Sequence, residues 1–139
     1  MMMDYPLLIS TLLERAEQIF PKKEVVSRTS AGIQRFTYKE IGKRTRRLAS
    51  VLEKLGVERG DRVGTFAWNH HRHLEVYFAA PGMGAVLHTI NIRLSPEHLV
   101  YIINHAEDKV LLIDDNLLPL IERVKDELPT VEAYIIMSD

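Results

Sequence analysis

The stretch RVGTFAWNHHRHLEVYFAAPGMGAVLHTINIRLSPEHLVYIINHAEDKVLLID, residues 62–114, contains the pattern that decides the fold. Short runs of β-favouring residues alternate here with segments whose apolar residues recur at helical spacing. Continued to the end of the chain, this pattern predicts strands at 63–68, 85–90, 109–113 and 133–137, and helices at 71–80, 96–105 and 117–128. Strands that alternate with helices need crossover connections. The sequence therefore predicts an α/β fold with a mostly parallel sheet flanked by helices.

The residues before this stretch predict two helices with an antiparallel hairpin between them. Apolar residues recur at helical spacing from Leu7 to Phe20, and Pro21 ends that segment. The β-favouring runs Glu24–Arg28 and Ile33–Phe36 are joined by Thr29-Ser30-Ala31-Gly32, which suits a hairpin turn. A small antiparallel hairpin is therefore expected near the amino end.

The second helix has clear signals at both ends. Thr37 and Glu40 have the spacing of a capping box, and Gly56 stands where a left-handed terminal residue is favourable. The apolar stripe expected to be buried consists of Ile41, Thr45, Leu48, Leu52 and Leu55.

Length and charge limit the possible functions. The 139 residues are enough for one domain, and we expect residues 1–139 to form a single α/β unit. Eighteen Lys and Arg against 19 Asp and Glu leave a net charge of −1, which argues against general nucleic-acid binding as the function. No cysteine is present, so disulfides and thiolate chemistry are excluded.

The apolar run at 76–87 is interrupted by Pro81 and two glycines and is too short to span a membrane. A cytoplasmic protein is expected.

The final predicted strand, Ala133–Met137, runs almost to the end of the sequence, and no helix follows to cover it. Parallel strands are normally covered on both faces. We therefore expect these residues to be part of a longer polypeptide, with exposed apolar surface that promotes dimers or larger species.

Two glycine-containing segments invite a phosphate-binding interpretation. Gly82-Met83-Gly84 follows a helix and precedes a strand, which is the reverse of the order in dinucleotide-binding loops, so a helix terminus is favoured. Ser27–Gly32 has suitable hydroxyls, but no lysine and no helix follow, so a hairpin turn is favoured.

The run Asn69-His70-His71-Arg72-His73 is the densest cluster of potential metal ligands. His71 and Glu75, one helical turn apart, could share a metal ion, although a third ligand is missing and Arg72 would oppose a cation. A solvated helix entry is the favoured interpretation.

Asp114 and Asp115 follow a predicted strand at the end where open α/β sheets bind ligands. Paired acids there could hold magnesium, as in receiver domains. The favoured interpretation is that one of the two caps the next helix and the other is solvated.

Basic residues form a stripe on the second predicted helix. The four are Lys39, Lys43, Arg46 and Arg47. Since no aromatic residues are interleaved with them, we interpret the stripe as solvated surface.

The segment RLSPEHLVYIINHAEDKVLLID (93–114) resembles the amino-terminal region of AMP-forming acyl-CoA synthetases, especially those for long- and medium-chain fatty acids. Three further stretches carry the same resemblance in one colinear frame: LLERAEQIFPKKEVVSR (12–28), FTYKEIGKRTRRLASVLEKLGVERGDRV (36–63) and WNHHRHLEVYFAAPGMGAVLHTINIRLS (68–95). The likeness covers essentially the whole chain. One departure is Ile92, where relatives commonly have proline after the asparagine, which leaves this loop less rigid.

The resemblance implies a parent enzyme that joins a fatty acid to the α-phosphate of ATP and then transfers the acyl group to coenzyme A. It implies ATP, Mg²⁺ and coenzyme A as cofactors or substrates. The family's phosphate loop, magnesium ligand, ribose-binding aspartate and mobile lysine would all lie after residue 139. No catalytic, cofactor-binding or metal-binding residue is therefore assigned to this chain, which by itself is expected to be inactive.

The positions that match the family are structural: the Thr37 capping box, the Gly56 helix stop, the Gly60-Asp61 turn and the loop at 91–96. The resemblance also implies a homo-oligomer, with the helix at Leu7–Phe20 as the best candidate for contacting a partner. Two alternatives remain open: another adenylate-forming ligase, such as an aryl-CoA ligase or a peptide-synthetase adenylation domain, and a non-catalytic α/β interaction module.

Overall fold

Parallel strands form the centre of the structure, a computed structural model that describes residues 4–138. Within these residues the main sheet has four strands in the order β4-β3-β5-β6. Their bounds are β3 Arg62–Phe66, β4 Val86–Thr89, β5 Asp108–Asp114 and β6 Ala133–Met137. Every neighbouring pair in this sheet is parallel, which confirms the predicted sheet.

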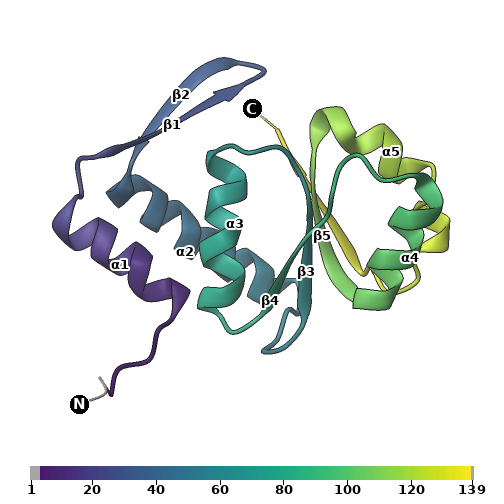
Figure 1. Ribbon diagram of the computed structural model, residues 1–139, viewed down its shortest axis with the longest axis horizontal. Helices are drawn as coiled ribbons and strands as arrows, with labels where there is room; N and C mark the ends of the chain where they lie inside the picture. Colours follow the sequence, from purple (N-terminus) through teal and green to yellow (C-terminus); the bar gives the residue numbers. More distant parts are fainter. Residues whose placement is uncertain (1–3, 139) are drawn as a thin grey trace.

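Helices cover both faces of the sheet (Figure 1). One face packs against α2 (Tyr38–Lys54) and α3 (His71–Gly82), and α1 (Ile9–Ile19) packs outside them. The other face packs against α4 (Pro96–Ala106), η1 (Asp115–Leu117), α5 (Leu118–Glu122) and η2 (Lys125–Glu127). The described helices include none that is long and apolar enough to cross a membrane.

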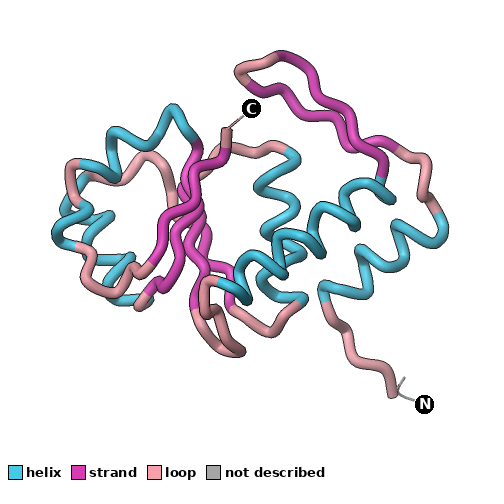
Figure 2. Tube along the Cα trace, turned by 180° about the vertical axis from the view of Figure 1, so that it is seen from behind, coloured by secondary structure: helices cyan, strands magenta, loops and turns pink. Residues whose placement is uncertain are grey.

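The predicted hairpin is present and forms a separate two-stranded antiparallel sheet, β1 (Glu24–Thr29) with β2 (Gly32–Thr37). Its turn places Gly32 at a φ of +109°, a conformation in which glycine is favoured. Phe36 lies between α2 and α3, with its ring centroid 4.5 Å from that of His71 and 4.8 Å from the Arg44 guanidinium carbon. Figure 2 shows the hairpin lying apart from the main sheet, beyond one end of α2 and α3.

The ends of α2 follow the expected signals, with one correction. The Thr37 hydroxyl accepts from the Glu40 amide and the Glu40 carboxylate accepts from the Thr37 amide, so the capping box is complete. Leu55 was expected to be buried but is 38% exposed, because it lies past the last turn of the helix. Gly56 turns the chain at a φ of +82° and brings Val57 into the core in its place, where the Val57 amide donates to the Leu52 carbonyl.

The prediction of one continuous helix over residues 117–128 is wrong. The structure has five residues of α-helix between two short 3₁₀ turns. The apolar spacing is nevertheless preserved, since the buried residues are Leu117, Ile121, Val124 and Leu128. Short irregular turns can hold the same apolar residues against the sheet, so spacing predicts burial here without predicting the hydrogen-bond pattern.

Candidate functional site

The order in which strands are added to the sheet reverses at β3, because β4 lies on one side of β3 and β5 lies on the other. The β3–β4 connection runs through α3 on one face, whereas the β4–β5 connection runs through α4 on the opposite face. The loops that leave the carboxyl ends of β3 and β5 therefore diverge, although these strands are neighbours. Open α/β sheets bind ligands at such a switch point.

A hollow of about 490 Å³ lies at this point. It is bounded by the tip of the hairpin, the loop after β3, the start of η1 and the end of β6. We call it the switch-point hollow, and its lining residues are Arg28, Thr29, Ser30, Trp68, His70, Arg72, Asp114, Asp115, Asn116 and Met137.

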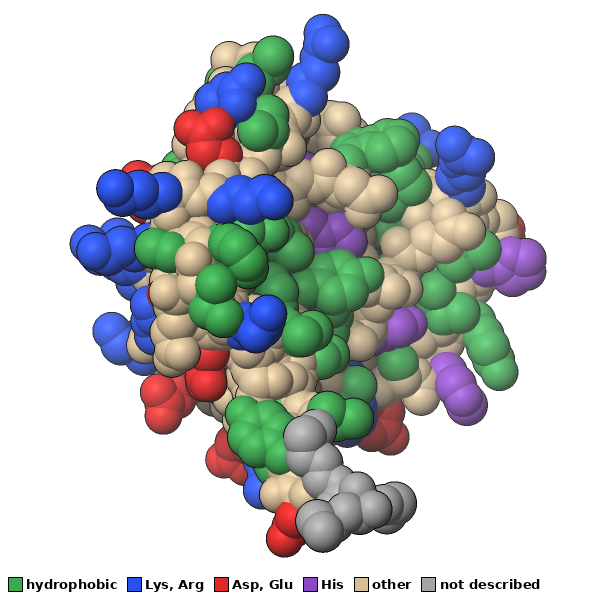
Figure 3. Space-filling view, turned by 60° about the vertical axis from the view of Figure 1, so that its left-hand side comes forward, with side chains coloured by type: hydrophobic (Ala, Val, Ile, Leu, Met, Phe, Trp, Pro, Cys, Tyr) green, Lys and Arg blue, Asp and Glu red, His purple; other side chains and the backbone are tan. Residues whose placement is uncertain are grey.

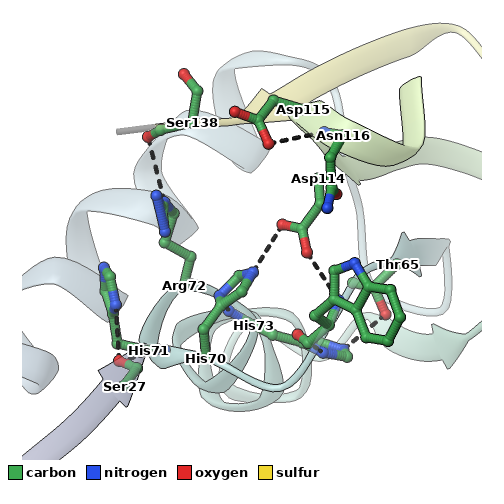
Figure 4. Close-up of polar contacts among 11 residues, drawn as sticks. Ser27, Thr65, His70, His71, Arg72, His73, Asp114, Asp115, Asn116 and Ser138 are labelled. Atoms are coloured by element: carbon green, nitrogen blue, oxygen red, sulfur yellow. Dashed lines mark hydrogen bonds and ion pairs between the residues drawn. The ribbon is translucent and has the colours of Figure 1, made fainter. Parts of the chain in front are cut away.

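Asp114 lines the switch-point hollow and joins the end of β5 to the loop after β3 (Figure 4). The residue is 4% exposed, and its two carboxylate oxygens accept from the Trp68 amide at 2.7 Å and from His70 Nε2 at 2.7 Å. The expected helix cap is therefore wrong for Asp114, which makes no capping hydrogen bond. Asp115 is exposed, and its carboxylate accepts from the Asn116 amide at 2.7 Å.

The arrangement around Asp114 does not fit a magnesium site. Both of its oxygens are occupied by protein donors, and the neighbouring Asp115 is turned to the backbone of η1. Among residues 4–138, no three His, Asp or Glu side chains gather in a way that could hold a metal ion.

The histidine cluster connects the start of α3 to three other elements, which corrects the expected solvated helix entry. His70 caps α3 by accepting from the His73 amide, and its other ring nitrogen donates to Asp114 at the end of β5. His71 is 3% exposed and bonds Ser27 of the hairpin at 3.0 Å. His73 is 7% exposed; its Nδ1 donates to the Trp68 carbonyl, and its Nε2 accepts from the Thr65 hydroxyl of β3 at 3.0 Å.

The alternative in which His71 and Glu75 share a metal ion has no support from their contacts. The Glu75 carboxylate is paired with Arg44 of α2, with Nε and Oε1 2.5 Å apart. His71 points to the hairpin instead. Sequence spacing alone could not reveal these partners, because Ser27 lies 44 residues from His71 and Arg44 lies 31 residues from Glu75.

The two glycine-containing segments and the basic stripe belong to the framework of the fold. Gly84, at a φ of +90°, follows the end of α3, and its carbonyl accepts from the Gly60 amide, so the helix-terminus interpretation of 82–84 is confirmed. Ser27–Gly32 forms the hairpin turn as expected. In the basic stripe, Arg46 pairs with Glu17 of α1 at 2.7 Å, while Lys39, Lys43 and Arg47 are exposed.

Burial at the site makes stability depend on pH through His73. Burial lowers the pKa of His73 below its usual value, and the hydrogen bond to the Trp68 carbonyl acts in the opposite direction. An unfolded histidine takes up its proton near pH ~6.5, so below that pH the unfolded state holds more protons than the folded one. The stability associated with neutral His73 is therefore present above that pH and is lost as pH falls through the folded-state pKa.

We expect the free energy of unfolding to decline as pH falls below about 6.5, and to decline less in a His73→Gln variant. Urea unfolding of both proteins, followed by circular dichroism between about pH 5 and about pH 7.5, measures the two slopes. Identical slopes would contradict the assignment of this acid sensitivity to His73.

Comparison with known proteins identifies the family. Residues 13–139 match the family model described as AMP-binding enzyme. Among solved structures, a Mycobacterium tuberculosis fatty acyl CoA synthetase superposes with a TM-score of 0.85 at 26% identity, covering 94% of this chain and 26% of that one. The anthranilate CoA ligase AuaEII superposes with a TM-score of 0.87 at 26% identity, covering 96% of this chain and 26% of that one. The chain belongs to the AMP-binding enzyme family.

Within this family the chain is similar to fatty-acid–CoA ligases. It is 57% identical to the long-chain-fatty-acid–CoA ligase of Thermus thermophilus, over 99% of this chain and 26% of the relative. It is 49% identical to the medium-chain-fatty-acid–CoA ligase of Ectopseudomonas oleovorans, over 99% of this chain and 25% of the relative. The chain thus spans about a quarter of the length of these relatives and matches their amino-terminal region.

Proposed function

We propose that the parent protein is an AMP-forming fatty-acid–CoA ligase and that residues 1–139 form one α/β unit of its large amino-terminal domain. The observation that carries this proposal is the 57% identity to the Thermus thermophilus ligase over the whole chain. In the proposed reaction the fatty-acid carboxylate attacks the α-phosphate of ATP and releases diphosphate. The thiol of coenzyme A then attacks the acyl carbon and releases AMP.

The role of this chain in that reaction is to build a wall of the domain. Polar groups in and beside the switch-point hollow are engaged with one another: in the hollow, Asp114 bonds His70 and the Trp68 amide, and beside it, His71 bonds Ser27. Such contacts hold the loops after β3 and β5 in fixed positions. ATP, Mg²⁺ and coenzyme A would be bound by residues that follow this region in the parent, which we place in the cytoplasm.

The proposal predicts different behaviour for the parent and for the 139-residue chain. The parent should form acyl-CoA and AMP from ATP, coenzyme A and a long- or medium-chain fatty acid, measured by product chromatography. The isolated chain should give no heat of binding when titrated with ATP and magnesium. Micromolar affinity of the isolated chain for ATP, or a parent that makes no acyl-CoA from any fatty acid, would contradict the proposal.

An aryl-CoA ligase is the second candidate, favoured by the structural similarity to the anthranilate CoA ligase. The same assay separates the two functions, because benzoate and anthranilate replace the fatty acid in parallel reactions. Preference of the parent for the aromatic acids would establish this candidate.

A homo-oligomeric parent is part of the proposal, with α1 as the contact surface. The outward side of α1 and the residues beside it carry apolar side chains at exposures from 46% to 61%: Leu8, Ile9, Leu12, Ile19 and Phe20. Figure 3 shows apolar side chains gathered on this side of the molecule between Lys and Arg side chains. Exposed apolar surface of this kind favours association.

A further inference from the structure

The side chain that caps α3 is an imidazole. His70 has extended backbone angles, φ −150° and ψ 178°, and its Nδ1 accepts from the His73 amide at 3.2 Å. Helices are more commonly capped by Ser, Thr, Asp or Asn. α2 and α4 follow that rule with the hydroxyls of Thr37 and Ser95, which take up no proton in the physiological range. The cap of α3 is instead a group that can be protonated in that range.

The contacts of His70 determine which of its ring nitrogens carries the proton. A backbone amide can only donate, so Nδ1, which accepts from the His73 amide, is the nitrogen without a proton. Nε2 then carries the proton and donates to the Asp114 carboxylate at 2.7 Å (Figure 4). The His70 side chain is nearly buried, so both ring nitrogens depend on these protein partners. The cap therefore requires the neutral imidazole.

A second proton on the His70 ring would change its two contacts in opposite ways. The proton would bind Nδ1, where an N–H would then face the His73 N–H, and the cap hydrogen bond would be lost. The contact of Nε2 with Asp114 would become stronger, because a positive ring would face a carboxylate. The new charge would also lie at the amino end of α3, where the helix dipole opposes it. Protonation therefore exchanges the helix cap for an ion pair with the end of β5.

The charged and titratable groups around His70 come from four elements. They are Asp114 of β5, Asp115 of η1, Arg28 of the hairpin, and His71, Arg72 and His73 of α3. The two acids attract a second proton to the ring, and the two arginines repel it. Burial lowers the pKa of His73, so His73 adds less positive charge here as pH falls than a solvated histidine would. Only Asp114 among the two acids bonds the ring directly, and its charge therefore favours the second proton most strongly.

The first turn of α3 also carries the residue that holds the hairpin. The His71 amide donates to the Ser27 hydroxyl at 3.1 Å, and the His71 ring bonds the same hydroxyl at 3.0 Å. We propose that His70 is a proton-sensitive helix cap, which at neutral pH holds the first turn of α3 and, through His71, the hairpin beside the switch-point hollow, and which releases both in acid. Asp114 keeps its contact with His70 in both states. The proposal concerns contacts within this chain and does not depend on the reaction of the parent.

Nuclear magnetic resonance on the full 139-residue chain tests the proposal in the wild type. Ring ¹⁵N shifts show which nitrogen of His70 carries the proton, and this should be Nε2 at about pH 7.5. As acid adds the second proton, protection of the His73 amide from hydrogen exchange, corrected for the intrinsic rate at each pH, should fall about tenfold. The Overhauser contact between Ser27 and the His71 ring should disappear with it. The His98 amide, which donates to the Ser95 hydroxyl that caps α4, should keep its protection.

His70→Asn is the matched variant, because an asparagine caps helices without taking up a proton in this range. Its His73 amide should stay protected in acid, whereas the control His98→Asn, at an exposed position of α4, should show the wild-type loss. If His70→Asn does not fold, His70→Ser replaces it. Equal loss in the wild type and the His70 variant would overturn the proposal. So would a proton on Nδ1 at neutral pH, a cap that survives the second proton, or a ring that stays neutral until the chain unfolds.

Discussion

Asp114→Ala should lower the free energy of unfolding of this chain by about 3 kcal/mol. The Asp114 carboxylate accepts from the Trp68 amide and from His70 Nε2, and the His70 side chain is only 7% exposed. Removing the carboxylate leaves two donors without their acceptor, and each unsatisfied buried donor costs about 1–3 kcal/mol. Urea unfolding of wild type and variant measures the difference.

The neighbouring residue provides a matched control. Asp115 is exposed and accepts only from the Asn116 amide among its described contacts, so Asp115→Ala should change stability by less than about 1 kcal/mol. Asp114→Asn should fall between the two, because its amide oxygen can replace one of the two acceptors. Equal effects of Asp114→Ala and Asp115→Ala would contradict the role of Asp114 in joining the two loops.

Phe66→Ala should have the largest effect of any single change proposed here, about 4 kcal/mol. Phe66 is fully buried at the carboxyl end of β3 and packs in the core formed with Leu99 and Ile103 of α4. Truncation to alanine removes a large apolar side chain and leaves a cavity that rigid strands and helices fill only in part. The change in unfolding free energy is measured by urea denaturation.

Tyr101→Ala is the comparison for this variant. Tyr101 is an aromatic residue on α4 that is 64% exposed, and its replacement should change stability by less than about 0.5 kcal/mol. A loss below about 1 kcal/mol for Phe66→Ala would show that the core beneath α4 does not stabilise the chain as the packing indicates.

Local signals predicted the elements that depend on local chemistry. The bounds of β6, Ala133–Met137, were predicted as the structure has them, because a short run of apolar residues begins soon after the turn at Pro129 and Thr130. The capping box of Thr37 and Glu40 was predicted because both partners lie within one helical turn. The apolar pattern also predicted the parallel sheet, since strands that alternate with helices have few other arrangements.

The polar contacts of the site could not be predicted in the same way. Asp114 has the local sequence of a helix cap, but its donors lie 44 and 46 residues earlier in the chain. The three histidines bond three different elements, and a local pattern does not distinguish a solvated imidazole from one that bridges distant strands. The prediction that Leu55 is buried failed for a related reason. The helical spacing of apolar residues continues in the sequence past the residue at which the helix ends.

Side-chain contacts hold the hairpin in a fixed position against α2 and α3. Phe36 is wedged between the His71 ring and the Arg44 guanidinium, and the Ser27 hydroxyl accepts from the His71 amide at 3.1 Å. The hairpin is thereby held to α2 and α3 at its base through Phe36 and to α3 at Ser27, the residue before those that line the switch-point hollow. Moving this side of the hollow outward would therefore first require the contact between Ser27 and His71 to break, so the position of the hairpin beside the hollow depends on α3.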